Sequence, residues 1–139
     1  MKVAWYPRYS LQGASSRLRV YAVHEAMLKL GIVSYLDAGA EDADLLVIQK
    51  LSGGDAVALA QRAGRKTIKV YDFDDVATFP SAHWAAGAVD FFTTDTEGHR
   101  LQALSSLGRR RCHVIPDAID YEPTGPLLPT SSGEAVWFG

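Results

Sequence analysis

Short apolar segments typical of β-strands alternate with helix-type segments along most of the chain. Leu45–Gln49 (L-L-V-I-Q) is apolar along almost its whole length, as expected for a strand that is covered on both faces. Ser15–Leu30 carries apolar residues at helical spacing, and Gly31 follows where a C-terminal cap belongs. We further expect strands at Val3–Pro7, Ile32–Leu36, Thr67–Tyr71, Val89–Thr93 and His113–Ile115, helices at Gly54–Ala63 and Thr96–Leu107, and a helical turn at Ser81–Gly87. This alternation predicts the α/β class with a doubly wound, mostly parallel, Rossmann-like sheet.

A change in composition near the end of the chain predicts a domain boundary. Residues 124–134 are rich in Pro, Gly, Ser and Thr, which is typical of a linker, and A-V-W-F-G follows with the pattern of a new strand. We therefore expect an N-terminal domain over residues 1–123, a linker over 124–134 and the start of a second domain over 135–139. The chain is then a two-domain protein cut at its hinge.

Composition and charge exclude several classes of function. The net charge of -2 gives no field that would attract nucleic acid or an anionic membrane. No apolar run approaches the roughly 20 residues that a transmembrane helix needs, and the N-terminus lacks the pattern of a signal peptide. The single cysteine, Cys112, excludes an internal disulfide and is expected to be a small core residue. We expect a cytoplasmic protein and leave peripheral attachment at the membrane surface open.

The loop after the first expected strand predicts an anion-binding site. Gly13 permits backbone dihedrals that other residues avoid, and the helix that follows offers free amides and the positive end of its dipole. Arg17 and Arg19 lie near this helix start, where cations oppose the macrodipole by roughly 0.3–1 kcal/mol each. We expect Gly13, Ser16, Arg17 and Arg19 to bind a phosphate or a carboxylate, so that replacing both arginines leaves stability equal or slightly higher. The alternative is two solvated arginines. The loop does not contain G-x-G-x-x-G, so dinucleotide binding is poorly supported, and it also lacks the G-x-x-x-x-G-K-[ST] loop of nucleotide triphosphatases.

Three carboxylates, Asp72, Asp74 and Asp75, follow the fourth expected strand. Charges this close need a cation, hydrogen-bond donors or open water to remain ionised. In an extended segment Asp72 and Asp74 point the same way and Asp75 points oppositely. The acids could cap a turn or form salt bridges, or they could accept hydroxyl groups of a sugar. If the two arginines are structural instead, their expected partners are Asp72 or Glu25. A divalent metal is the least favoured reading, and no two histidines have the H-x-x-x-H spacing of a zinc site. We expect Asp74 and Asp75 to be catalytic, acting on ligand hydroxyls without a metal.

Four segments together resemble a known family. They are G-A-S-S-R-L-R-V at the first helix, V-Y-D-F-D-D-V after the fourth strand, V-D-F-F-T-T-D-T-E-G-H-R, and V-I-P-D-A-I-D-Y before the linker. The order of these elements is similar to that of the N-terminal domain of a GT-B fold glycosyltransferase, most like the retaining enzymes of family 4. The final V-W-F-G resembles the start of the C-terminal domain of that family. Two departures are that Ala118-Ile119 replaces the usual glycine-valine, and that aspartates stand at the strand-four tip where several relatives have a histidine.

The resemblance implies a reaction, and it implies that donor and acceptor bind mainly to different domains. Enzymes of this family bind a nucleotide-diphosphate sugar mainly on the C-terminal domain and the acceptor mainly on the N-terminal domain, with catalysis in the cleft between them. They need no metal and no cofactor besides the nucleotide sugar as co-substrate. The donor-binding glutamates of the family lie in the second domain. The chain alone is therefore expected to fold but not to transfer sugar.

Other classes of protein fit the same pattern less well. A GT-A transferase also uses D-x-D, but in one continuous domain, and a haloacid-dehalogenase-like phosphatase has its D-x-D-G-T on the first strand. A receiver domain would need paired acids after strand one and an aspartate after strand three, where this chain has Arg8-Tyr9 and Lys50. A non-catalytic α/β ligand-binding or receiver-like module is the remaining alternative.

Overall fold

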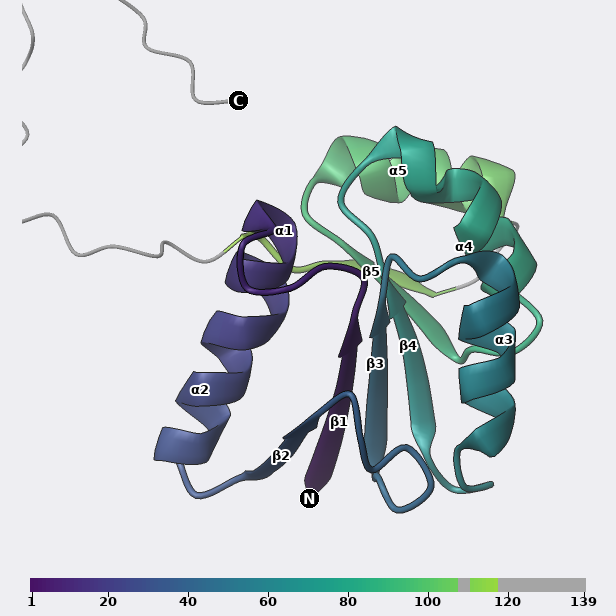
Figure 1. Cartoon of the computed structure of the whole chain (residues 1–139). Helices are drawn as coiled ribbons and strands as arrows, with labels where there is room; N and C mark the ends of the chain where they lie inside the picture. Colours follow the sequence, from purple (N-terminus) through teal and green to yellow (C-terminus); the bar gives the residue numbers. More distant parts are fainter. Residues whose placement is uncertain (108–110, 118–139) are drawn as a thin grey trace, which may run out of the picture.

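The computed structural model of the chain describes residues 1–107 and 111–117. Within them, a six-stranded parallel sheet runs in the order β2-β1-β3-β4-β5-β6, with helices on both faces (Figure 1). The strands are β1 (Lys2–Pro7), β2 (Val33–Leu36), β3 (Leu45–Gln49), β4 (Ile68–Asp72), β5 (Phe91–Thr94) and β6 (Cys112–Val114). The helices are α1 (Ala14–Ser16), the π-helical turn η1 (Arg17–Tyr21), α2 (Ala22–Lys29), α3 (Gly53–Arg62), the 3-10 turn η2 (Val76–Thr78), α4 (Phe79–Ala85) and α5 (Glu97–Ser106). The predicted doubly wound α/β class is confirmed. The predicted linker over 124–134 and the second-domain strand over 135–139 lie outside the described residues.

Residues 14–29 form one continuous helical stretch, in which η1 joins α1 to α2. The stretch ends at the predicted glycine: Gly31 has a φ of +73°, which is costly for residues with a Cβ. The Gly31 N–H donates to the Leu28 carbonyl at 3.0 Å, and the Ile32 N–H donates to the Met27 carbonyl at 2.9 Å. These two bonds form a Schellman motif, which satisfies carbonyls that the end of the helix would leave unpaired. The π-helical turn was not predicted.

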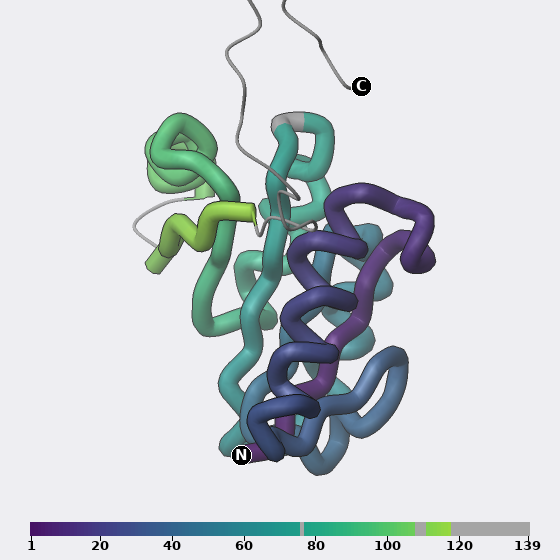
Figure 2. Tube along the Cα trace, turned by 90° about the vertical axis from the view of Figure 1, so that its left-hand side faces the viewer, coloured from purple at the N-terminus to yellow at the C-terminus, as the bar shows by residue number. Residues whose placement is uncertain are grey.

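The two faces of the sheet carry two separate apolar cores. Toward α3, α4 and α5, the larger core contains Ile48, Tyr71 and Phe92, each at most 1% exposed. Toward the helical stretch 14–29, a smaller core is built around Trp5 and Val47. Figure 2 shows that the stretch lies over only part of this second face, and among the described residues no helix covers β5 and β6 there.

On the face toward the stretch 14–29, parallel register aligns side chains of neighbouring strands in two rows. An apolar row consists of Trp5, Val47, Val70 and Phe91. The next row toward the carboxyl ends of the strands consists of Pro7, Gln49, Asp72 and Thr93. Polar side chains are therefore concentrated at the carboxyl edge of the sheet, directly beside an apolar layer.

Helices α3 and α4 approach closely at Gly53. A Cβ atom placed on this glycine would lie 2.4 Å from the Cβ of Trp84, which is closer than real side chains come. Helix α4 starts two residues earlier than the predicted turn at Ser81–Gly87, and Pro80 lies in its first turn, where the missing N–H costs nothing. The absence of a side chain at Gly53 thus sets how near the two helices lie.

Candidate functional site

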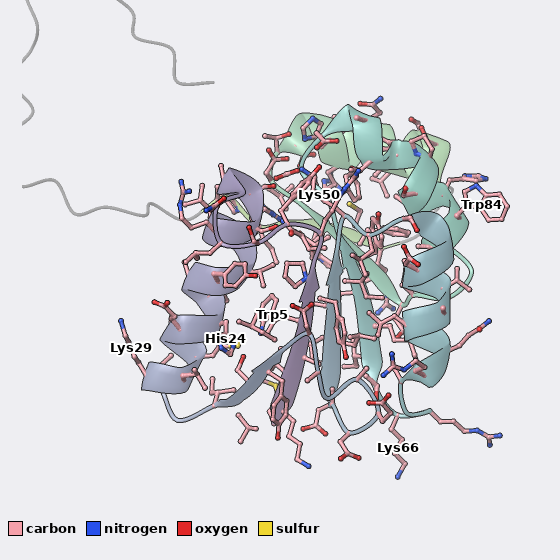
Figure 3. All side chains as sticks on the ribbon, in the orientation of Figure 1. Trp5, His24, Lys29, Lys50, Lys66 and Trp84 are labelled. Carbon is pink, nitrogen blue, oxygen red and sulfur yellow. The ribbon has the colours of Figure 1, made fainter. Side chains whose placement is uncertain are left out.

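Strands β1 and β3 are neighbours, and the chain moves outward from them in opposite directions. This is the topological switch point, where open α/β sheets bind ligands at the carboxyl ends of their strands. The loop that follows β1 leads into the helical stretch 14–29, and Lys50 follows β3 directly, at the upper edge of the sheet in Figure 3. The residues at this edge form the candidate site.

The loop after β1 is fastened to β3 through Ser16. The Tyr9 N–H donates to the Ser16 hydroxyl at 3.3 Å, and this hydroxyl donates to Gln49 Oε1 at 2.7 Å. Ser16 and Gln49 are both fully buried. Gln49 Nε2 has no hydrogen-bond partner among the described residues, so both N–H donors of this amide remain buried and unsatisfied. Gly13 closes the turn, and a Cβ there would lie 2.6 Å from the Cβ of Tyr9.

Arg19 connects three separate parts of the chain. Its Nε and Nη2 donate to the two carboxylate oxygens of Asp72 at 2.8 and 2.5 Å, and its Nη1 donates to the Ile115 carbonyl at 2.8 Å and to Asp117 Oδ1 at 2.7 Å. Thr93 donates its hydroxyl to Asp72 at 2.6 Å. The side chains of Arg19 and Asp72 are 4% and 7% exposed. Burial lowers the pKa of the Arg19 guanidinium, but the hydrogen bonds and charges of Asp72 and then Asp117 outweigh it, so the net pKa is raised.

Lys50 pairs with the other two acids that follow β4, Asp74 and Asp75. Its ammonium forms ion pairs with Asp74 and, at 2.6 Å, with Asp75, and it lies 3.4 Å from the Ser15 hydroxyl. Lys50 has a φ of +56°, in the left-handed region that is unfavourable for a residue with a Cβ. Asp75 also accepts a hydrogen bond from the Thr78 N–H at 2.9 Å. The Lys50 and Asp74 side chains are buried, whereas that of Asp75 is 43% exposed.

The pKa values of the two carboxylates that pair with Lys50 are shifted in opposite directions. Burial raises the pKa of Asp74, and Lys50 offsets only part of this effect. Burial also raises the pKa of Asp75, but hydrogen bonds and charge from Lys50, together with bonds from Thr78, outweigh it, so the net pKa is lowered. Burial lowers the pKa of the Lys50 ammonium, but the two acids outweigh it and the net pKa is raised. At neutral pH the exposed Asp75 carboxylate is thus ionised and oriented by a buried cation.

The acids of the strand-four tip divide into two groups. Asp74 and Asp75 share Lys50, while Asp72 pairs with Arg19. The expectation that Asp75 points away from Asp74 is wrong, because both carboxylates pair with Lys50. Strand β4 ends at Asp72, and the strand alternation does not continue beyond it.

The two arginines of the π-helical turn η1 also have different environments. Arg19 forms salt bridges with Asp72 and Asp117. For Asp72, this agrees with the alternative that the acids form salt bridges. Arg17 is partly buried beside the same helix start. Binding of a phosphate or carboxylate by Gly13, Ser16, Arg17 and Arg19 stays a prediction.

Lys50 and the pair Asp95–His99 were not predicted as site residues. His99 Nδ1 lies 2.6 Å from Asp95 Oδ1 at the carboxyl end of β5. Burial raises the pKa of Asp95, but His99 and further hydrogen bonds outweigh it and lower the net pKa. Asp and His four residues apart, at an expected strand-to-helix junction, were the available sequence signal. The only hint of Lys50 was a charged residue directly after an apolar strand.

The described part of the chain contains no cluster of metal-ligating side chains and no helix that could span a membrane. Within residues 1–107 and 111–117, no three His, Cys, Asp or Glu side chains are grouped so that they could hold a metal ion. None of the helices in these ranges is both long enough and apolar enough to cross a bilayer. Cys112 is buried, as predicted, and burial raises its thiol pKa to about 11.

No family model, no curated protein and no solved structure matches this chain. The assignment of a function therefore depends on the fold and on the geometry of the carboxyl edge.

Proposed function

We propose that this chain is the acceptor-side, N-terminal domain of a glycosyltransferase that uses a nucleotide-sugar donor. The observation that carries the proposal is the Asp75 carboxylate, which is 43% exposed and is held by the buried Lys50 at the switch point. A carboxylate that stays ionised and has a fixed orientation accepts hydrogen bonds from the hydroxyl groups of a sugar acceptor. The four sequence segments that resemble the GT-B family support the same conclusion.

In the proposed reaction, the acceptor hydroxyl oxygen forms a bond to the anomeric carbon of the donor sugar. The bond from that carbon to the nucleotide diphosphate breaks, its electron pair stays on the diphosphate oxygen, and the hydroxyl proton passes to the departing diphosphate. Asp75 accepts the hydrogen bond of this hydroxyl and orients it, while Asp74 and Lys50 hold the position of Asp75. The donor binds mainly on a second domain, and the closed cleft excludes water. No metal is used in this proposal.

The test uses the full-length protein with a panel of nucleotide sugars and acceptors. Asp75→Asn and Asp74→Asn should each lower kcat/KM by about tenfold or more, which corresponds to at least roughly 1.4 kcal/mol of transition-state stabilisation. Asp42→Asn is the matched control, because Asp42 is exposed in the loop before β3, at the opposite edge of the sheet. The chain of residues 1–139 alone should give no transfer above donor hydrolysis. If both site variants keep the wild-type kcat/KM, Asp74 and Asp75 have a structural role and no catalytic one.

A non-catalytic ligand-binding module is the alternative function. It predicts saturable binding of a hydroxylated ligand by the full-length protein without any turnover. Calorimetric titration combined with the transfer assay separates the two functions, since only the transferase consumes the nucleotide sugar.

A further inference from the structure

A cavity of about 280 Å³ lies between the helical stretch 14–29 and the sheet. The helical stretch contributes Leu18, Val23 and Met27 to its walls, and the sheet contributes Trp5, Val47 and Val70. Trp5 lies between α2 and the sheet in Figure 3. Its indole N–H donates to the Ser34 hydroxyl at 3.0 Å, so it is not available to a ligand.

The cavity has polar groups only at its end toward the carboxyl edge. These groups belong to Arg19, Asp72 and Thr93, and they are bonded to one another. At roughly 30 Å³ for each molecule, about nine waters would fit, but each needs two to four polar partners. The walls cannot supply those partners, so hydrocarbon suits this space better than water does. Ile115 and Pro116 line the cavity beside the polar end, and Ile115 is 54% exposed.

We propose that this cavity binds the hydrocarbon tail of an amphiphilic ligand whose uncharged, hydroxylated head lies at the carboxyl edge of the sheet. The apolar row of Trp5, Val47 and Val70 is next to the polar row, so a tail in the cavity brings the head to that edge. Assigning this amphiphile as the sugar acceptor rests on the proposed function, whereas the preference for a hydrocarbon tail rests on the cavity alone.

The charges at this edge favour an uncharged head over an anionic one. Arg19 faces two carboxylates, and Lys50 faces two others. Within these two groups, four carboxylates thus face two cations, and both cations are already paired by the protein. Like charge disfavours an anion, whereas hydroxyl groups can donate to these oxygens.

The probe is octyl glucoside, used below its critical micelle concentration on the chain of residues 1–139. It should raise the melting temperature in a saturable way, because a ligand that binds the folded state stabilises it. Methyl glucoside has the same head without a long tail, and octanoate has a tail of similar length with an anionic head. We expect no shift with methyl glucoside, and binding of octanoate at least about tenfold weaker than that of octyl glucoside.

The matched variants change one face of β4. Val70→Phe fills the cavity and should weaken octyl glucoside binding by at least about tenfold without lowering the melting temperature. Ile68→Phe is the control, because Ile68 lies two residues earlier on the same face and is 48% exposed outside the cavity. If Val70→Phe does not fold, Val23→Phe fills the cavity from the helix side. Binding that is equal in the filled and control variants would overturn the proposal.

Three further results separate this proposal from others. If the molecular mass in solution rises from that of a monomer to that of a dimer as the protein concentration increases, and octyl glucoside does not bind, the cavity would be assigned to contact with a second copy of the chain. This result would overturn the proposal. Octyl glucoside binding by the cavity, together with no sugar transfer by the full-length protein, would support the cavity and refute the proposed function. Transfer to soluble acceptors without any octyl glucoside binding would support the function and refute the cavity proposal.

Discussion

Replacement of Arg19 by alanine tests the ion-pair network at the centre of the site. The Arg19 and Asp72 side chains are 4% and 7% exposed, so the variant leaves a buried carboxylate whose remaining partner is the Thr93 hydroxyl. Breaking a buried pair by removing one partner costs about 3–5 kcal/mol. Relief of an unfavourable helix-dipole interaction would return roughly 0.3–1 kcal/mol at most, and that effect fades beyond the first turn. The helical stretch begins at Ala14, so Arg19 is already past its first turn.

The structure therefore reverses the stability prediction made from the sequence. Instead of equal or slightly higher stability, we expect Arg19→Ala to lower the melting temperature by roughly 10–20 °C, given a few degrees for each kcal/mol in a domain of this size. Urea denaturation at pH 7 should give the loss of unfolding free energy directly. Arg8→Ala is the control, because Arg8 is exposed and its guanidinium lies over the ring of Tyr9, at 5.2 Å.

A double variant separates the cost of an orphaned charge from the cost of lost packing. Arg19→Met combined with Asp72→Leu removes both charges and should recover most of the stability that Arg19→Ala loses. If Arg19→Ala and Arg8→Ala have the same melting temperature, the buried pair does not form in solution and the description of the site is wrong.

Two further predictions concern packing and alkaline pH. Gly53→Ala should lower the free energy of unfolding by about 1–3 kcal/mol in urea denaturation, since its Cβ would lie 2.4 Å from that of Trp84. Gly54→Ala is the control: no atom lies near its Cβ position, so it should be neutral or stabilising by up to about 1 kcal/mol. Equal effects of the two variants would contradict the close approach of α3 and α4. Burial raises the pKa of Tyr71 to about 12 and that of Cys112 to about 11, from ordinary values of 10.0 and 9.0, so their contribution to stability is fully present below pH 9 and is lost between pH 9 and 12. Urea denaturation across this range checks the loss, and absorbance titration that finds Tyr71 ionising near pH 10 would contradict it.

The fold could be predicted from the sequence because its signals are local. The apolar run at Leu45–Gln49 is strand β3, and Gly31 ends the helical stretch with the expected positive φ. The pairing within the site depends instead on residues far apart in the sequence. Arg19 meets Asp72 after 53 residues and Asp117 after 98, and no local pattern predicts which carboxylate a given arginine reaches. The π-helical turn that contains Arg19 has no local sequence signal in this chain either.

Lys50 combines an unfavourable backbone conformation with buried ion pairs, and glycine at this position tests which effect dominates. Lys50→Gly relieves a left-handed conformation that costs roughly 1–2 kcal/mol, but it leaves the Asp74 carboxylate buried without its cation. Burial already raises the pKa of Asp74 against the attraction of Lys50, so removing Lys50 raises it further. A raised carboxyl pKa in the folded state means a contribution to stability that is present at low pH and is lost as the pH rises through that pKa.

Lys50→Gly should therefore be less stable than the wild type at pH 7, and the difference should become smaller as the pH is lowered toward 4. Urea denaturation at both pH values measures the difference, with Lys66→Gly as the control for an exposed lysine at the opposite edge of the sheet. A variant that is more stable than the wild type at pH 7 would mean that backbone strain outweighs the ion pairs. Asp74 would then not depend on Lys50, and the positioning of Asp75 in the proposed reaction would need another explanation.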